Sequence, residues 1–323
     1  MFSKLILNQK PKENYMTKIL IATDKPFAPI AVKGIRKVVE EAGFELAMLE
    51  NYTIQADFIS AVADDVDAVI IRSDKADKAV IDAGKSLKII VRAGAGYDNI
   101  DLQAATEKGI CAMNTPGQNS NAVAELALGM MVYHARNFFN GKSGFELKDK
   151  KLGIHAYGYV GKNVARIAHG FGMKVFAFDP FISKTEIEKE GVTAVASAEE
   201  LYSTCNYISL HLPANSQTKQ SINYALLSKM PAPAVLVNTA RAEVIQEADL
   251  IKLFADRKDF AYLSDVEPTN KTEFEANFKG RYFFTPKKMG AQTEEANINA
   301  GIAAVRQIVN FLKNGDRTFQ VNK

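Results

Sequence analysis

One stretch of the sequence restricts the possible folds more than any other. Residues 152–180 read LGIHAYGYVGKNVARIAHGFGMKVFAFDP, where an apolar run turns through glycines into a helical pattern and then a second apolar run. A strand that turns through glycine into a helix leaves backbone N–H groups at the helix N-terminus, where they can face a pyrophosphate. Gly158 and Gly161 carry no side chain that would block this approach. The stretch therefore predicts a nucleotide-binding strand–turn–helix–strand unit.

The turn departs from the usual glycine pattern at its first position. Ala156 stands where G-x-G-x-x-G has its first glycine, so the tight turn must accept a methyl group. Asp179 follows eighteen residues after Gly161, about the spacing of an acid that accepts hydrogen bonds from the adenosine ribose hydroxyls. Its charge would repel a 2′-phosphate, which favours NAD over NADP. A glycine-rich α/β turn that binds nothing is the alternative interpretation.

Length and charge exclude several classes of protein. With 323 residues, 47% of them hydrophobic, the chain is long enough for two domains of ordinary size. Its 40 Lys and Arg nearly balance 37 Asp and Glu without a basic run, so we expect no nucleic-acid partner. No apolar run approaches the roughly twenty residues of a membrane span, so we expect no membrane partner. Cys111 and Cys205 lack metal-ligand spacing, which predicts a cytoplasmic protein without a metal site.

Apolar runs alternate with helical patterns in two series, which is typical of parallel sheets with helical crossovers. The first series predicts strands at residues 18–24, 44–50, 67–71, 87–91 and 110–114, with helices at 30–42, 54–63 and 102–108. The second series predicts strands at residues 152–156, 174–178, 206–211, 234–238, 260–264 and 281–286. The sequence thus predicts an α/β fold with two doubly wound parallel-sheet domains.

Two further helical patterns set the predicted domain boundaries. Residues 121–139 form a long pattern between the two series and are expected to bridge the domains. Met130, Met131, Val132 and Phe138 give this helix more apolar surface than one small domain need cover, which predicts a homodimer through residues 121–139. A helix at 294–313 has no strand of its own in the second series and should return to the first domain. The predicted domains are residues 16–117 with 287–323, and residues 118–286. Residues 1–15 are interpreted as a tail, with Met16 as an alternative start of translation.

Several blocks, in order along nearly the whole chain, resemble the D-isomer-specific 2-hydroxyacid dehydrogenase family. They are RAGAGYDNID, MNTPGQNSNAVAELALGMM, the glycine turn with Asp179, HLPANSQT, VNTARAEVI and DVEP. The resemblance implies a flavodoxin-like substrate domain and a Rossmann NAD domain with a cleft between them. It also implies hydride transfer between nicotinamide and C2 of a small 2-hydroxy acid. Within the family the chain is most similar to short-type D-3-phosphoglycerate dehydrogenases, which implies oxidation of 3-phosphoglycerate in serine synthesis.

The resemblance assigns catalytic roles to two residues that follow predicted strands. Arg241, in NTAR, matches the substrate arginine, whose planar guanidinium can hold a carboxylate and polarise the C2 oxygen. Glu267 matches the glutamate that orients the general acid/base. The loop before Glu267 reads DVEP and is shorter than the family's DVFxxEP pattern. Glu267 therefore either reaches the site or is a solvated loop acid.

The family's acid/base histidine, found in T-P-H-x-G, is missing from TPKKMGA (residues 285–291). Alignment on residues 290–293 puts Lys288 in its place, and alignment on Thr285 and Pro286 puts Lys287 there. The longer anchor favours Lys288 as the group that moves the C2 hydroxyl proton. The histidines elsewhere in the chain are interpreted as structural: His134, His155, His169 and His211.

The remaining predicted contacts are to NAD and to a phosphate. The resemblance places NAD against the glycine turn and the ends of later strands, with Asp265 near the nicotinamide amide. These residues are Ala156, Tyr157, Gly158, Tyr159, Val160, Gly161, Asp179, Pro180, His211, Pro213, Thr218, Thr239, Ala240, Asp265 and Gly290. A phosphorylated substrate is suggested by arginines at two strand ends, with backbone or amide contacts nearby. These residues are Arg72, Ser73, Arg92, Ala93, Gly94 and Asn99. Solvated strand-end charges are the alternative interpretation.

Two other functions stay open at this point. A glyoxylate or hydroxypyruvate reductase would use the same scaffold without needing a phosphate on its substrate. A non-catalytic NAD-sensing protein would explain the missing histidine.

Overall fold

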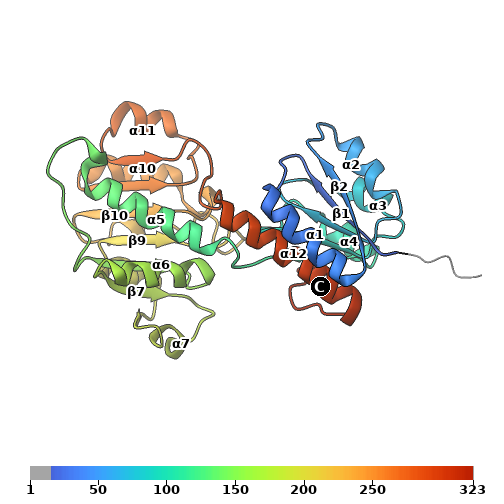
Figure 1. Ribbon diagram of the computed structural model, residues 1–323. Helices are drawn as coiled ribbons and strands as arrows, with labels where there is room; N and C mark the ends of the chain where they lie inside the picture. The colour runs from blue at the N-terminus through green and yellow to red at the C-terminus, as the bar shows by residue number, and fades with distance from the viewer. Residues whose placement is uncertain (1–15, 323) are drawn as a thin grey trace, which may run out of the picture. The chain divides into compact units, whose positions relative to one another are not determined.

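Two parallel sheets organise the part of the chain that the computed structural model describes, residues 16–322 (Figure 1). One sheet lies in unit 1, whose described residues are 16–115 and 298–322, and the other lies in unit 2, residues 116–297. The predicted α/β fold with two parallel-sheet domains is thereby confirmed. The predicted tail at 1–15 and the alternative start at Met16 concern residues that lie outside this range or at its edge.

Unit 1 contains five parallel strands in the order β2-β1-β3-β4-β5. The order reverses between β1 and β3, and in open α/β sheets ligands bind beyond the carboxyl ends of the strands at such a switch point. The strands are β1 (Lys18–Thr23), β2 (Glu45–Glu50), β3 (Ala68–Ile71), β4 (Ile89–Arg92) and β5 (Cys111–Asn114).

Helices cover both faces of the unit 1 sheet because alternate side chains of each strand point to opposite faces. Ile19 and Ile21 of β1 pack in the layer of α1 and α12, whereas Leu20 and Ala22 pack in the layer of α2, α3 and α4. The sequence prediction lacked α3, a six-residue helix too short to show a periodic pattern. The helices are α1 (Pro29–Ala42), α2 (Gln55–Val62), α3 (Lys78–Ala83), α4 (Leu102–Glu107) and α12 (Glu294–Asn314).

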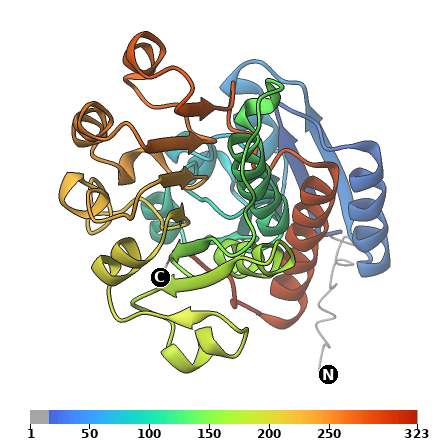
Figure 2. The same ribbon diagram turned by 90° about the vertical axis from the view of Figure 1, so that its left-hand side faces the viewer.

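Unit 2 contains seven parallel strands in the order β12-β11-β10-β9-β6-β7-β8, with helices on both faces (Figure 2). This is the order of a doubly wound dinucleotide-binding sheet, with its switch point between β6 and β9. The strands are β6 (Lys151–His155), β7 (Lys174–Phe178), β8 (Thr193–Ala194), β9 (Tyr207–Leu210), β10 (Ala234–Asn238), β11 (Phe260–Ser264) and β12 (Tyr282–Phe284).

Two hydrophobic layers hold the unit 2 sheet. In β10, Val235 and Val237 pack in the layer of α5 and α6, and Ala234 and Leu236 pack in the layer of α8 to α11. The helices are α5 (Ser120–Ala135), α6 (Tyr159–Gly170), α7 (Lys184–Glu188), α8 (Ala198–Thr204), α9 (Tyr224–Leu227), α10 (Glu247–Asp256) and α11 (Lys271–Asn277). No helix among residues 16–322 has the length and apolar character needed to cross a membrane.

The long helix is shorter than the sequence pattern indicates. It ends at Ala135, and Asn137, Phe138 and Phe139 follow with φ of 49°, 54° and 55°, outside the right-handed helical region. This left-handed turn lets the Phe138 ring pack edge-on against the Tyr133 ring, with 5.1 Å between the ring centroids. The predicted helix over residues 121–139 is therefore wrong beyond Ala135.

The apolar side chains of α5 are mostly covered within unit 2. Met130 and Met131 are 2% and 0% exposed. Val132 and Phe138 are partly buried against the same core, so most of the apolar surface that predicted a dimer is covered by the helix's own unit. Phe139, which follows the helix, is 67% exposed.

The boundary at which the chain leaves unit 2 falls later than the sequence pattern indicates. The units divide at 115/116 and 297/298, whereas the sequence placed the divisions at 117/118 and 286/287. Residues 287–297 stay with unit 2, where the N–H groups of Met289 and Gly290 donate to the Asp265 carboxylate. The loop that carries Lys287 and Lys288 thus belongs to the nucleotide-binding unit.

Candidate active site

The glycine turn joins β6 to α6 at the switch point of unit 2. Gly158 is the N-cap of α6, and a Cβ built on it would meet nothing within 4 Å. A Cβ built on Gly161 would lie 2.5 Å from the carbonyl oxygen of Ala156. The two glycines therefore have different roles: Gly158 leaves the N-terminus of α6 open to a ligand, and Gly161 lets α6 pack against the turn.

Ala156 adopts a φ of 76°, in the left-handed region that favours glycine. Its N–H still donates to the Phe178 carbonyl at 2.9 Å, so the turn closes despite the methyl group. For an L-residue this conformation costs about 1 kcal/mol relative to glycine. The turn thus accepts a side chain where the usual pattern has none, at a modest cost in free energy.

The Asp179 carboxylate holds the turn from the end of β7. Its Oδ2 accepts a hydrogen bond from the Tyr157 N–H and its Oδ1 accepts one from the Phe181 N–H, both at 2.8 Å. A carboxylate offers about four lone-pair sites, so ribose hydroxyls can still donate to it. The Tyr157 side chain is 0% exposed and donates to Glu190, so only its backbone faces the turn. An open helix N-terminus next to a fixed carboxylate fits the pyrophosphate and ribose of a dinucleotide.

Two histidines at the ends of β6 and β9 are neutral at physiological pH. Burial, with a smaller contribution from His155, lowers the pKa of His211 to about 3. Burial also lowers the pKa of His155 to about 4, although Asp179 acts in the opposite direction. His211 Nε2 lies 2.9 Å from Ser209 Oγ, and its Nδ1 lies 3.5 Å from Thr239 Oγ1. With both ring nitrogens engaged, His211 is a poor replacement for the missing acid/base.

Arg241 and Lys288 meet at one backbone carbonyl. Arg241 Nη1 donates to the Ala240 oxygen at 2.9 Å, and Lys288 Nζ lies 3.4 Å from the same oxygen. Buried Asn238 fixes this turn, because its Nδ2 donates to the Arg241 carbonyl and its Oδ1 accepts from the Ala240 N–H, both at 2.9 Å. An amine and a guanidinium are thereby brought together after β10, at the end of the sheet where ligands bind.

Asp265 follows β11 and is 1% exposed. Its Oδ1 accepts hydrogen bonds from Thr285 Oγ1 at 2.9 Å and the Met289 N–H at 2.7 Å. Its Oδ2 accepts from the Gly290 N–H at 2.7 Å. Thr285 is a residue that the sequence reasoning did not select, and only its place in the T-P motif could have drawn attention to it.

Glu267 lies on the surface of unit 2, in the loop between β11 and α11. Its Oε1 is 2.9 Å from Lys271 Nζ, and the two side chains are 44% and 39% exposed. Such exposed pairs contribute little to stability because water screens them. The role of Glu267 as the residue that orients the acid/base stays a prediction.

In unit 1 three of the predicted substrate residues surround one carbonyl. The Arg72 oxygen accepts from Arg92 Nε at 3.0 Å and from Asn99 Nδ2 at 3.1 Å. Ser73 Oγ lies 3.4 Å from a carboxylate oxygen of Asp24. Gly94, after Ala93, has a φ of 152°, which favours glycine, and a Cβ there would displace the Arg92 guanidinium. These residues gather beyond β3 and β4, near the switch point.

The Arg72 guanidinium is partly used within unit 1. Its Nη1 donates to the carbonyls of Lys25 and Pro26 at 3.0 and 3.1 Å. Burial lowers the pKa of Arg72, although Asp74 and Asp24 act in the opposite direction. Sequence reasoning missed Asp74, which is 5% exposed and accepts from Tyr52 Oη at 2.7 Å and from the Arg72 N–H at 3.2 Å.

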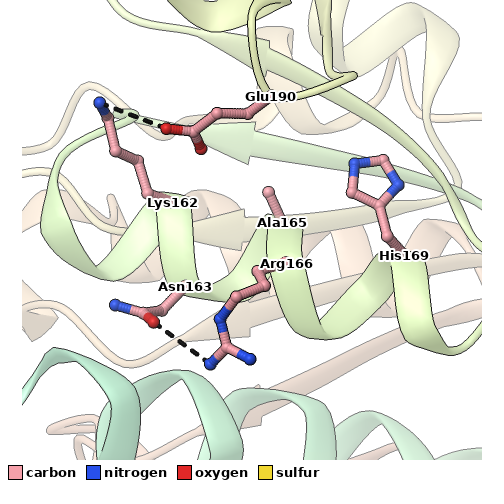
Figure 3. Close-up of a pocket in the computed structure, with 6 residues that line it drawn as sticks. All are labelled: Lys162, Asn163, Ala165, Arg166, His169 and Glu190. Atoms are coloured by element: carbon pink, nitrogen blue, oxygen red, sulfur yellow. Dashed lines mark hydrogen bonds and ion pairs between the residues drawn. The ribbon is translucent and has the colours of Figure 1, made fainter.

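A separate pocket of about 450 Å³ lies along α6, away from the predicted catalytic residues (Figure 3). The cations that line it already have partners. Lys162 Nζ is 3.2 Å from Glu186 and 3.6 Å from Glu190, and Arg166 Nη2 donates to Asn121 Oδ1 at 2.6 Å. Lys162 is thus paired with two carboxylates, and Arg166 is held by the amide oxygens of Asn121 and Asn163.

Comparison with known proteins relates these features to a family. Residues 121–284 match the D-isomer specific 2-hydroxyacid dehydrogenase, NAD binding domain. A crystal structure of cofactor (NAD+) bound 3-phosphoglycerate dehydrogenase from Entamoeba histolytica is 51% identical in sequence, with a TM-score of 0.86, and the match covers 96% of this chain and 99% of that one.

Two curated relatives extend the comparison. Hydroxypyruvate reductase of Thermotoga maritima is 37% identical over 273 residues, which are 79% of this chain and 88% of the relative. D-3-phosphoglycerate dehydrogenase of Methanocaldococcus jannaschii is 35% identical over 317 residues. The match covers 92% of this chain but only 58% of the relative, so this chain spans little more than half the length of that protein. With the glycine turn and the doubly wound sheet of unit 2, these matches show that the chain belongs to the D-isomer specific 2-hydroxyacid dehydrogenases, which use NAD.

Proposed function

We propose that this protein is a D-3-phosphoglycerate dehydrogenase that oxidises 3-phosphoglycerate to 3-phosphohydroxypyruvate in serine synthesis. The observation that carries the proposal is the meeting of Arg241 and Lys288 at the Ala240 carbonyl. A guanidinium that can hold a carboxylate then lies beside an amine that can move the proton of the adjacent C2 oxygen. The 51% identity with the Entamoeba histolytica enzyme supports this choice of substrate.

In this proposal the two cations divide the chemistry. Arg241 holds the substrate carboxylate and polarises the C2 oxygen. Lys288 takes the C2 hydroxyl proton during oxidation and returns it during reduction. Because an ordinary lysine amine is protonated at neutral pH, it is a ready acid and a poor base. Reduction is therefore the easier direction at neutral pH.

NAD, when bound, supplies the nicotinamide that exchanges a hydride with C2. The N-terminus of α6 at Gly158 would hold the pyrophosphate, and Asp179 would accept hydrogen bonds from the adenosine ribose hydroxyls. Thr239 and Ala240, after β10, would hold the cofactor next to Arg241.

Arg72 and Arg92 are assigned to the substrate phosphate. The test compares reduction of 3-phosphohydroxypyruvate and hydroxypyruvate by NADH in the wild type and in Arg72→Ala. Loss of a charged hydrogen bond costs about 2–3 kcal/mol, so kcat/KM for the phosphorylated substrate should fall about 30- to 150-fold. Hydroxypyruvate should be little affected. Arg36→Ala, which removes an exposed arginine of α1, is the matched control.

A hydroxypyruvate or glyoxylate reductase is the second candidate. It is favoured by the Thermotoga maritima relative and by the use of Arg72 Nη1 on two backbone carbonyls. Equal kcat/KM for both substrates in the wild type, unchanged in Arg72→Ala, would establish it. Binding of NAD without turnover of any 2-oxo acid would instead support the non-catalytic NAD-sensing protein.

We also propose a cytoplasmic homodimer. Cys111 and Cys205 are both free and buried, which suits a reducing compartment. Phe139 and Phe145, 67% and 39% exposed, support an interface beside the end of α5. A monomer in sedimentation at micromolar concentration would contradict the dimer.

A further inference from the structure

We infer that Asp265 is a positioning residue that sets the place of Lys288 through the backbone of the loop at residues 285–290. The inference rests on the proposed function, in which Lys288 moves the proton. All three hydrogen bonds described for the Asp265 carboxylate come from this loop: from Thr285 Oγ1, the Met289 N–H and the Gly290 N–H. The last two donors come directly after Lys288, so the carboxylate fixes the backbone at the point where the lysine side chain begins.

The same residue is tied to the Arg241 turn. The Asp265 N–H donates to the Asn238 carbonyl at 3.0 Å. The Asn238 amide in turn holds Ala240 and Arg241 by two hydrogen bonds of 2.9 Å. Asp265 thus joins the turn that carries the guanidinium to the loop that carries the amine. Because this link is a backbone N–H, it survives replacement of the Asp265 side chain, which should move the loop that carries the amine and leave the Arg241 turn in place.

A buried carboxylate at this position is costly unless its oxygens are satisfied. Three neutral donors from one loop provide this, and they do so only while the loop keeps its present backbone path. Gly290 has to lack a side chain, because a Cβ there would lie 2.9 Å from Asp265 Oδ2. The Asp265 carboxylate and Gly290 together restrict the loop to one close-packed conformation.

A lysine needs such support more than a histidine does. Its amine is at the end of a flexible four-carbon stem, so its position depends strongly on where the backbone starts it. A shift of about 1 Å in a catalytic group can cost on the order of 100-fold in rate. A loop held at three points therefore limits the positions that the Lys288 amine can reach.

The family resemblance places Asp265 near the nicotinamide amide, and the two roles predict different measurements. With three of about four lone-pair sites used, the Asp265 carboxylate keeps one for a nicotinamide amide, so both roles are open to it. Loss of a nicotinamide contact would appear as a higher NADH Kd. A positioning role would appear in kcat, and only while Lys288 is present.

The test is a double-mutant cycle with 3-phosphohydroxypyruvate and NADH as substrates. Asp265→Asn puts an NH2 group against loop donors, whichever way the amide lies. It should lower kcat about 10- to 100-fold. In the Lys288→Ala background the same substitution should cost nothing further. An equal fractional loss of kcat in both backgrounds would overturn the inference, and the NADH Kd, measured alongside, reports any nicotinamide contact separately.

Two further variants make the outcome unambiguous. Thr285→Val removes one of the three donors at nearly constant volume and should give a smaller, equally non-additive loss; it carries the test if Asp265→Asn does not fold. Asp249→Asn alters a carboxylate that accepts from the Tyr224 N–H elsewhere in unit 2 and should leave kcat unchanged. If Lys288→Ala alone keeps wild-type kcat, the proposed role of Lys288 fails. If Lys288→Ala is impaired and Asp265→Asn adds to it, only the positioning inference fails.

Discussion

The two glycines of the α6 turn should separate ligand binding from folding when each is replaced by alanine. At Gly161 the new Cβ would lie 2.5 Å from the Ala156 carbonyl oxygen and 3.0 Å from Ile154 Cγ2. Forcing a methyl group into packed surroundings costs about 1–3 kcal/mol. Replacement of a helical glycine recovers about 0.5–1 kcal/mol of that cost. Gly161→Ala should therefore lower the free energy of unfolding by about 0.5–2 kcal/mol.

Gly158→Ala should behave in the opposite way. The position has no left-handed φ, and its Cβ would meet nothing within 4 Å, so the fold accepts alanine. The methyl group would instead occupy the space in which a pyrophosphate approaches the backbone. Loss of one hydrogen bond to a charged group, about 1.5–3 kcal/mol, corresponds to a rise of about 10- to 150-fold in the NAD Kd.

The assay is urea unfolding of the free protein together with NAD titration by calorimetry. Gly170→Ala, at the end of the same helix and also without a neighbour within 4 Å, is the control and should change neither the NAD Kd nor the fold. Our assignment of the turn would be refuted if Gly158→Ala bound NAD like the wild type. It would also be refuted if Gly161→Ala were as stable as the wild type.

Three other predictions concern single ionisable side chains. Lys288→Ala should abolish most of the oxidation activity, whereas Lys287→Ala should not. The oxidation rate of the wild type should keep rising with pH beyond 8, and a plateau near pH 7 would argue against a lysine base. Asp179→Ser should reduce the preference for NAD over NADP at least tenfold in kcat/KM, and an unchanged ratio would exclude Asp179 from the ribose site. Because the pKa of His211 is about 3 when folded and near 6.5 when unfolded, the unfolded chain binds more protons between these values. The contribution of the neutral His211 ring to the free energy of unfolding is fully present above pH 6.5 and falls by about 1–2 kcal/mol at pH 5. His211→Gln should flatten this pH dependence, which unfolding measured at pH 5 and pH 7 would show.

The strands were the most predictable part of the fold. Residues 174–178, 234–238 and 260–264 were predicted with the bounds that β7, β10 and β11 have. Strands of a parallel sheet are buried on both faces, so they appear as continuous apolar runs with clear ends. Short helices such as α3 and α7 were missed because five or six residues do not complete two turns of a periodic pattern.

The candidate site was predictable in its residue types but not in its contacts. The spacing of Gly158 and Asp179 follows from the strand–turn–helix–strand order, which is local in sequence. The approach of Lys288 to the Ala240 carbonyl joins groups 48 residues apart, and that of Thr285 to Asp265 joins groups 20 apart. Such contacts depend on how loops from different strands pack at one sheet end, and spacing alone carries no information about this.

The left-handed turn at the end of α5 has a consequence for local opening of unit 2. Three successive non-glycine residues with positive φ, from Asn137 to Phe139, each store about 1–3 kcal/mol that only their surroundings offset. The ends of the segment are joined by hydrogen bonds from Asn137 Nδ2 to the Ser143 carbonyl at 2.6 Å and from the Phe145 N–H to the Ala135 carbonyl at 2.9 Å, and the other hydrogen bonds described for it are between near neighbours. Amide hydrogens of this segment should therefore exchange with solvent far sooner than those of β10, and a protease should cut the native chain here first.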